Sequence, residues 1–319
     1  MKKTLFIVIP TIALFIVIIC IAGMILITRS TQKNFHAEQP MDDVDIIMPI
    51  AGTPYFIETA PGLKFKFDTG ADMSALSEKD AETLRKMGYE VTESFGPILG
   101  RDGYGDILFS SRRYTVALPV GGYETRQDSA GNRSVHYSGH PATVLRNVDF
   151  AKSDGEISTL GLDILRKFKI ECRFNDKTVS LTEHIPAHFS KVVEMEHNIH
   201  LTDILWSPVR SYVIVSVNQR PNVYQVDTGL QRAPVKKPSS SIARAKHSLR
   251  RDSLSTMRQG YEAYVDDEGW IDFGSRSGTK KVYYYDNNED SFQVNPLNIF
   301  QQDLIIDIEG KGIYFRHSI

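Results

Sequence analysis

Two copies of the tripeptide Asp-Thr-Gly are the residues of this 319-residue chain whose types and spacing suit chemistry. Asp68-Thr69-Gly70 follows the alternating run Phe65-Lys66-Phe67, and Asp227-Thr228-Gly229 follows Tyr224-Gln225-Val226. An alternating apolar run ending in such a turn is typical of a strand that delivers one carboxylate into a cleft. Two carboxylates held close together cannot both ionise readily, so such a pair holds one shared proton and can act as base and acid.

A single Asp-Thr-Gly would be ordinary turn chemistry, but a larger repeat argues against two unrelated turns. The segments 159–181 and 295–315 carry the same apolar pattern at an offset of 135 positions, which places Leu162 on Leu297. The two Asp-Thr-Gly copies are 159 positions apart. Two repeats are too few for a solenoid, so we predict two facing halves joined near residues 186–201.

The elements that must hold these turns are predicted to be short antiparallel strands. Apolar residues recur in short runs within 46–67, with glycine and proline turns between the runs. After the first Asp-Thr-Gly, Ser77 with Asp80 three residues later predicts the start of a helix that ends near Gly88.

A glycine-rich hairpin is predicted to follow over residues 96–118. Residues 121–141 lack a strand pattern, so we expect an irregular excursion there before a strand at 144–150. The second half is 24 residues shorter than the first between the landmarks of the repeat. We expect this deficit to fall where the first half has its glycine-rich hairpin.

Residues 5–27 are almost unbroken apolar sequence, long enough for a transmembrane helix. A secretory signal would have a shorter apolar core and a small-residue cleavage site, so we interpret residues 1–30 as an uncleaved, single-pass membrane anchor. The positive charges before this segment slightly outnumber those just after it, which places the globular part outside the cytoplasm. The polar residues 31–45 are interpreted as a tether.

Composition excludes several classes of protein and of site. A formal net charge of -2 argues against nucleic acid as a partner. The two cysteines, Cys20 and Cys172, form no disulfide framework. The histidines around the inter-half linker lack ligand spacing, so we expect no metal site, and no glycine-rich loop feeds a helix that would receive a nucleotide cofactor.

Two motifs of the first half resemble those of the aspartic peptidases. They are Phe65-Lys66-Phe67-Asp68-Thr69-Gly70-Ala71-Asp72 and, downstream, Leu160-Gly161-Leu162-Asp163-Ile164-Leu165. The first half is similar to the retroviral (retropepsin) type, and the tandem arrangement is similar to the two-lobed pepsin type. The resemblance spans residues 46–319 and implies a mainly β fold of two acid-protease-like barrels related by internal duplication, at 46–190 and 191–319.

The resemblance also implies roles for individual residues. Asp68 and Asp227 would be the catalytic pair, activating a water that attacks a peptide carbonyl without a metal, a cofactor or a covalent intermediate. Supporting roles carry over to the residues beside them: Thr69 and Thr228 would brace the loops, Gly70 and Gly229 would let the backbone approach, Ala71 and Asp72 would line the cleft beside the substrate, and Tyr104 would lie at the tip of a flap.

Departures from the family pattern leave alternatives open. Leu230 stands where the family has a small residue, Gln231 stands where the first half has Asp72, and Pro296 replaces the glycine that Gly161 provides. The sequence therefore predicts a membrane-anchored, monomeric two-lobed endopeptidase that cuts peptide or protein substrates. One alternative is a homodimeric retropepsin-type enzyme using Asp68 alone, and another is a catalytically inactive peptide-binding protein.

A basic segment interrupts the second half over residues 232–251. It is interpreted either as a solvated loop and helix face or as a contact for acidic lipid headgroups or acidic substrate.

Overall fold

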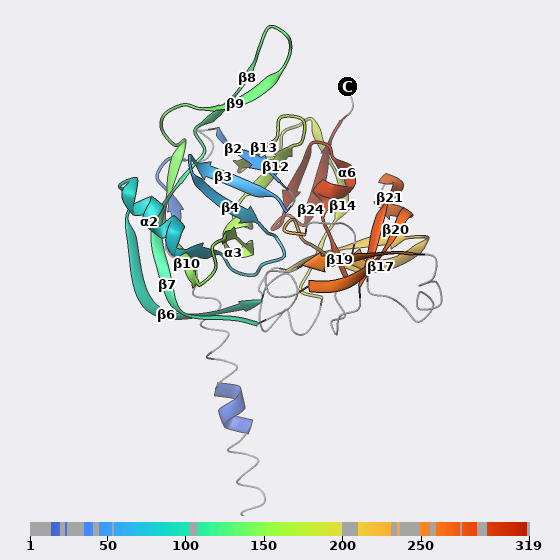
Figure 1. The fold of residues 1–319 in the computed structure, drawn as a ribbon, viewed down its shortest axis with the longest axis horizontal. Coiled ribbons are helices and arrows are strands. Elements are labelled where there is room, and N and C mark those ends of the chain that lie inside the picture. The colour runs from blue at the N-terminus through green and yellow to red at the C-terminus, as the bar shows by residue number, and fades with distance from the viewer. Residues whose placement is uncertain are drawn as a thin grey trace, which may run out of the picture.

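The computed structural model describes most of the chain after the N-terminal segment. The described residues are 14–19, 23, 35–40, 45–52, 54–101, 107–199, 210–230, 235–236, 249–255, 260–274, 276–285 and 292–317. Their fold is mainly β (Figure 1). Residues 14–19 are helical and exposed, but most of the predicted anchor at 1–30 lies outside the described residues. No helix in this described part of the chain has the length and hydrophobicity to cross a membrane.

The first half builds most of a 14-stranded sheet, and a nine-residue helix follows the Asp68 turn in the chain. Its strands are β1 (His36–Ala37), β2 (Ile46–Ala51), β3 (Phe56–Ala60), β4 (Leu63–Phe67), β5 (Ala75–Ser77), β6 (Val91–Arg101), β7 (Ile107–Val120), β10 (Thr143–Ser153), β11 (Ser158–Leu160), β12 (Lys169–Arg173) and β13 (Thr178–Thr182), its helices are α2 (Glu78–Lys86) and α3 (Leu162–Leu165), and β8 (Tyr123–Gln127) pairs separately with β9 (Arg133–Tyr137).

The second half adds three strands to that sheet and forms an eight-stranded sheet of its own. The added strands are β14 (Phe189–Glu194), β23 (Leu304–Asp307) and β24 (Gly312–Arg316); the second sheet holds β15 (Glu196–His197), β16 (Ser211–Val217), β17 (Arg220–Val226), β18 (Val235–Lys236), β19 (Arg250–Ser255), β20 (Gly260–Phe273), β21 (Arg276–Tyr285) and β22 (Phe292–Val294), and α6 (Pro296–Phe300) follows β22.

The two halves repeat one pattern of strand pairing. β4 pairs in parallel with β11, and β17 pairs in parallel with β22. The halves meet where β12 pairs with β23: Ile170 lies opposite Ile306, and Glu171 lies opposite Ile305. At the offset of 135, Ile305 corresponds to Ile170, and Ile306 corresponds to Glu171. Ile170 therefore pairs with the counterpart of Glu171, and Glu171 pairs with the counterpart of Ile170. Such reciprocal pairing is the sign of a two-fold relation, here within one chain.

Local sequence signals explain the helix beside the first turn. The Ser77 side chain caps α2 by accepting from the Asp80 backbone N–H, and Gly88 follows the helix with a φ of +86°. A serine cap and a left-handed glycine are the usual start and stop signals of a helix, so the predicted helix is confirmed. The buried Ala81 and Leu84 attach it to the core.

Two expectations about connecting segments are wrong. Residues 121–141 are not irregular, because most of them form the β8–β9 hairpin, which projects from the first half (Figure 1). The second half is also not shortened at the predicted place, which was the glycine-rich hairpin of the first half. The hairpin β6–β7 has a counterpart in β19–β20, whereas 22 residues join β7 to β10 and only two join β20 to β21. The insertion that lengthens the first half is therefore mainly the β8–β9 hairpin.

Part of the predicted tether lies against the first half. β1 pairs with β10, where His36 lies opposite Arg146. The rings of Phe35 and Phe168 are 5.9 Å apart, edge to face. These contacts fix the described residues 35–40 on the sheet.

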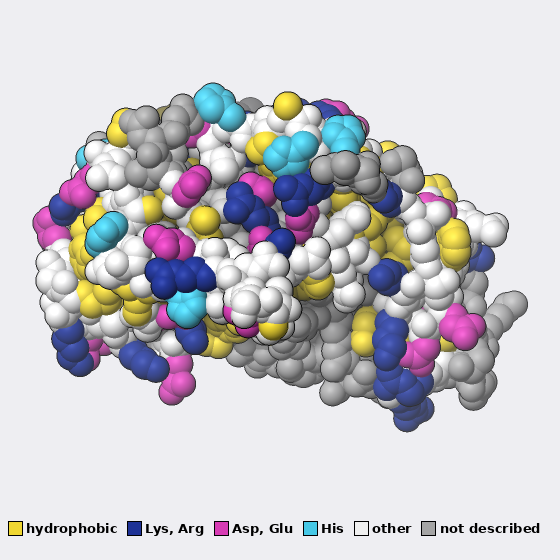
Figure 2. All heavy atoms as spheres, turned by 90° about the horizontal axis from the view of Figure 1, so that it is seen from above, with side chains coloured by type: hydrophobic (Ala, Val, Ile, Leu, Met, Phe, Trp, Pro, Cys, Tyr) yellow, Lys and Arg dark blue, Asp and Glu magenta, His cyan; other side chains and the backbone are white. Residues whose placement is uncertain are grey.

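The molecular surface in Figure 2 mixes both signs of charge. Lysine and arginine side chains lie among aspartate and glutamate side chains on that face. This distribution agrees with the formal net charge of -2.

Candidate active site

Asp68 and Asp227 come together at the junction of the two halves. Each lies directly after a strand, Asp68 after β4 and Asp227 after β17, and they are only 4% and 2% exposed. Each carboxyl group lies against the glycine of the opposite turn, and each affects the pKa of the other. The chain thus places two carboxyl groups, 159 positions apart in sequence, in one buried pair.

The threonines of the two turns hold each other through reciprocal hydrogen bonds. The Thr69 N–H donates to Thr228 Oγ1, and the Thr228 N–H donates to Thr69 Oγ1, both at 3.0 Å. Each hydroxyl also donates to the strand of the opposite half, Thr69 to the Val226 carbonyl at 3.1 Å and Thr228 to the Phe67 carbonyl at 3.0 Å. Because all four bonds are buried, they fix one loop against the other.

The glycines of the two turns leave room for the opposite carboxylate. A Cβ atom on Gly70 would lie 2.4 Å from Asp227 Cγ, and a Cβ atom on Gly229 would lie 2.3 Å from Asp68 Cγ. Both distances are far shorter than a van der Waals contact. Any side chain at either position would therefore push the carboxyl groups apart.

Hydrogen bonds and charges make the two aspartates unequal. Asp68 Oδ1 accepts from the Gly70 and Ala71 N–H groups at 2.9 and 3.1 Å, and Asp68 Oδ2 accepts from Lys66 Nζ at 2.7 Å. Burial alone would raise the pKa of Asp68, but Lys66 and these hydrogen bonds hold the pKa below its ordinary value.

Asp227 has a weaker set of stabilising partners. Its Oδ1 accepts from the Gly229 N–H at 2.9 Å. Burial and the negative charge of Asp68 raise the pKa of Asp227 well above its ordinary value, against the opposing charge of Lys66. The pair therefore favours an ionised Asp68 beside a protonated Asp227.

Asp72, which the resemblance placed beside the substrate, is bound by an arginine of the second half. Arg210 Nε donates to Asp72 Oδ1 at 2.8 Å, and both side chains are 3% exposed. Arg210 also donates to Gln225 Oε1 at 3.4 Å, and Gln225 Nε2 donates to the Gly70 carbonyl at 3.2 Å. These bonds connect Asp72 to the second half and support the Asp68 turn from that side.

The Asp227 turn is supported from behind by Asn295. Asn295 Nδ2 donates to the carbonyls of Thr228 and Leu230 at 2.9 and 3.0 Å, and its Oδ1 caps α6 by accepting from the Leu297 N–H at 3.0 Å. Pro296 is compatible with this arrangement, because the first residue of a helix needs no N–H partner.

Several of these residues were not singled out from the sequence. Arg210 and Gln225 carry no local signal, since their partners are far away in the chain. Lys66 did carry a local signal, because residues two positions apart on a strand lie on the same face. Lys66 and Asp68 were therefore expected on the same side of the strand. Tyr104 and most of the basic segment 232–251 lie outside the described residues.

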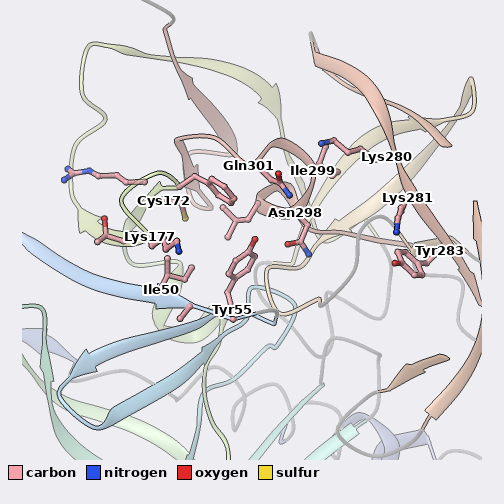
Figure 3. A pocket seen from close by; sticks show the side chains of 16 residues that line it. Ile50, Tyr55, Cys172, Lys177, Lys280, Lys281, Tyr283, Asn298, Ile299 and Gln301 are labelled. Carbon is pink, nitrogen blue, oxygen red and sulfur yellow. The ribbon is translucent and has the colours of Figure 1, made fainter. Parts of the chain in front are cut away.

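A cavity of about 610 Å³ lies between the halves, away from the two aspartates. Figure 3 shows Tyr55 and Lys177 of the first half facing Lys280 and Asn298 of the second half across it. Neither Asp68 nor Asp227 is among its lining residues. Among the described residues, no group of three or more His, Cys, Asp or Glu side chains is placed to hold a metal ion.

Comparison with known proteins adds little beyond the overall fold. No protein family and no curated protein matches this sequence. A solved structure described as "Crystal structure of edgp" is similar with a TM-score of 0.46 and 11% sequence identity, over 86% of this chain and 95% of that chain. A similarity this weak carries no argument about the site.

Proposed function

We propose that this protein is an aspartic endopeptidase with a two-lobed, acid-protease-like fold, and that it hydrolyses peptide bonds with Asp68 and Asp227. The observation that carries the proposal is the reciprocal Thr69–Thr228 bonding, which holds two buried carboxyl groups beside each other. A structural role alone would not need this pair, because burying an ionised group costs free energy.

The chemistry follows from the unequal state of the pair. The ionised Asp68 accepts a proton from a water molecule as that water attacks the peptide carbonyl. The protonated Asp227 donates a hydrogen bond to the carbonyl oxygen, which develops negative charge in the transition state. Asp68 then gives the proton it took from water to the amine nitrogen as the C–N bond breaks, which leaves one proton on the pair.

The proposal favours one chain over a homodimer as the active unit. Both carboxyl groups and all four bracing hydrogen bonds come from the same chain. A second copy would have to replace these contacts to bring two Asp68 residues together. We further propose that the N-terminal apolar segment 5–27 anchors the enzyme in a membrane and keeps the globular part extracytoplasmic.

The test is cleavage of a mixture of unstructured peptides by the full-length chain in detergent micelles, followed by mass spectrometry over acidic to neutral pH. Asp68→Asn and Asp227→Asn should each abolish cleavage, because each removes one proton-transfer group without changing shape. Asp154→Asn, at an exposed position, is the matched control and should retain activity.

The same experiment separates the alternatives. Loss of activity with Asp68→Asn but not with Asp227→Asn would indicate the homodimeric mechanism. Peptide binding without any Asp68-dependent cleavage would indicate the catalytically inactive peptide-binding protein.

A further inference from the structure

Lys66 places a cation directly against one member of the pair. Its Nζ lies 2.7 Å from Asp68 Oδ2, and the two side chains are 12% and 5% exposed. At the offset of 159 that relates the two turns, the counterpart of Lys66 is Gln225, which is neutral. The repeat therefore preserves the carboxylates but gives a positive charge to only one of them.

We propose that Lys66 is a positioning residue that holds Asp68 as the ionised base and leaves Asp227 as the proton-carrying acid. The proposal rests on the proposed peptidase function and adds an assignment of roles to it. In a symmetric pair the proton would be shared between equal partners. A cation on one side removes that equality, since it stabilises the negative charge on the nearer carboxylate.

The charge balance of the site supports this role. A pair that holds one proton carries one negative charge, and the Lys66 ammonium compensates it. A buried charge is costly unless it is paired, so Lys66 and the singly protonated pair stabilise each other. The lowered pKa of Asp68 and the raised pKa of Asp227 agree with this assignment.

Among the described residues, the two strands that pair with β4 carry one charged side chain, Glu58 on β3. On β3, Glu58 is paired with Lys64 at 3.8 Å, and the Lys64 side chain is 65% exposed. β11, on the other side of β4, consists of Ser158, Thr159 and Leu160. The Asp72–Arg210 pair near the turn is internally compensated.

Replacing Lys66 should move the pH profile of cleavage in a defined direction. In Lys66→Met the pKa of Asp68 rises, so the acidic limb, where Asp68 must be ionised, moves to higher pH. The pKa of Asp227 also rises, so the alkaline limb, where Asp227 loses its proton, moves to higher pH as well. A nearby opposite charge changes a carboxyl pKa by about 1–3 units, so the acidic limb should move by about that amount.

Three further variants make the experiment specific. Lys66→Gln copies the residue at the equivalent position of the second half and should move the profile in the same direction. Lys66→Arg keeps the charge and should keep the wild-type profile. Lys64→Met removes the same charge two residues earlier on the same face of β4, but at an exposed position, and should leave the profile unchanged. An unmoved profile in both neutral variants, or an equal shift in Lys64→Met, would overturn the proposal.

A second readout does not depend on turnover. pH-difference infrared spectra of the full-length chain report the C=O stretch of protonated carboxyl groups, and Asp68→Asn and Asp227→Asn assign the two bands. Lys66→Met should raise the pH at which the Asp68 band disappears. If the band shifts but the chain cleaves no peptide, the proposed peptidase function is wrong and the role of Lys66 stands. If the chain cleaves peptides but the bands do not shift, the peptidase function stands and the role of Lys66 is wrong.

The cavity between the halves carries a second, independent inference. Its described lining includes four basic side chains and no acidic one: Arg173, Lys177, Lys280 and Lys281. Arg173 is paired with Glu171, and Lys281 lies 3.6 Å from Asp267. Lys177 and Lys280 come from opposite halves, and no acidic side chain in the described part of the chain forms an ion pair with either of them.

The other lining residues of the cavity include apolar side chains that can contact the apolar part of a ligand. Ile50, Phe174, Leu297 and Ile299 line the cavity. Thr178 also lines it, and its buried hydroxyl has no hydrogen-bond partner among the residues that the structure describes. We infer that this cavity binds a small organic anion with an apolar or aromatic body. A volume of about 610 Å³ lies in the range of small-molecule sites, about 300–1,000 Å³.

A pair of probes with the same ring and opposite charge tests this site. Indole-3-acetate should give saturation-transfer NMR signals with the full-length chain, and tryptamine should not. The double variant Lys177→Gln/Lys280→Gln should weaken indole-3-acetate binding at least about tenfold, which corresponds to roughly 1.4 kcal/mol. Lys191→Gln, on β14, is the control. Equal binding of both probes, absence of indole-3-acetate binding, or an unaffected double variant would refute the assignment.

Discussion

Removing Arg210 should destabilise the protein far more than removing an exposed arginine. Arg210→Met removes the arginine that forms an ion pair with the buried Asp72 carboxylate, since both side chains are 3% exposed. The charge centres of a pair with a 2.8 Å contact lie about 4 Å apart, which gives about 4 kcal/mol at an effective dielectric constant of about 20. Breaking a buried pair by removing one partner typically costs about 3–5 kcal/mol, in agreement with that figure.

The assay is thermal unfolding of the full-length chain, followed by circular dichroism. At about 2 °C per kcal/mol for a chain of this size, Arg210→Met should lower Tm by about 6–10 °C. The control Arg316→Met breaks an exposed pair with Asp303 at 3.0 Å and should cost less than about 1 kcal/mol.

The double variant Asp72→Leu/Arg210→Met decides whether the buried charge causes the loss. It removes both charges, so it should recover at least about 2 kcal/mol relative to Arg210→Met. If Arg210→Met cost no more than Arg316→Met, or if the double variant lost the sum of the two single changes, the account of this pair would be wrong.

Three other predictions concern the turns themselves. Gly70→Ala should abolish cleavage, checked by the peptide assay, because the added Cβ would lie 2.4 Å from Asp227 Cγ; retained activity would contradict the geometry. Thr228→Val leaves the buried Thr69 N–H without its acceptor and should cost about 1–3 kcal/mol in chemical unfolding, whereas an unchanged midpoint would mean that the bond contributes nothing. Asn295→Ala removes the donors to two carbonyls behind the second turn and should lower both Tm and the rate of cleavage, with a drop in neither as the refuting result.

The local parts of the fold and of the site were predictable from the sequence. The strand that leads into each Asp-Thr-Gly turn and the helix that begins after Ser77 depend on neighbouring residues, and such signals survive in a single sequence. The β8–β9 hairpin was missed because its strands are mostly polar and carry little apolar alternation. The Arg210–Asp72 contact joins residues 138 positions apart, and no local sequence pattern predicts such a contact.

Lys66 shows a different kind of omission, because its signal was present in the sequence. The alternation that marks β4 as a strand also puts Lys66 and Asp68 on one face. The run alternates lysine with apolar residues, and Lys66 is the lysine nearest to Asp68 on that face, so its position is informative. Burial of such a lysine requires a partner, and Asp68 is the carboxylate within reach.

The support of the two turns is unequal, and the inequality matches the proposed division of roles. The Asp68 turn is held by Lys66, by Gln225 of the opposite half and, through Gln225, by the Arg210–Asp72 pair. The Asp227 turn is held from behind by the neutral side chain of Asn295. A base must stay charged in a buried site, and the cation at Lys66 provides that stabilisation. An acid must keep its proton there, and a neutral support preserves the burial that raises its pKa.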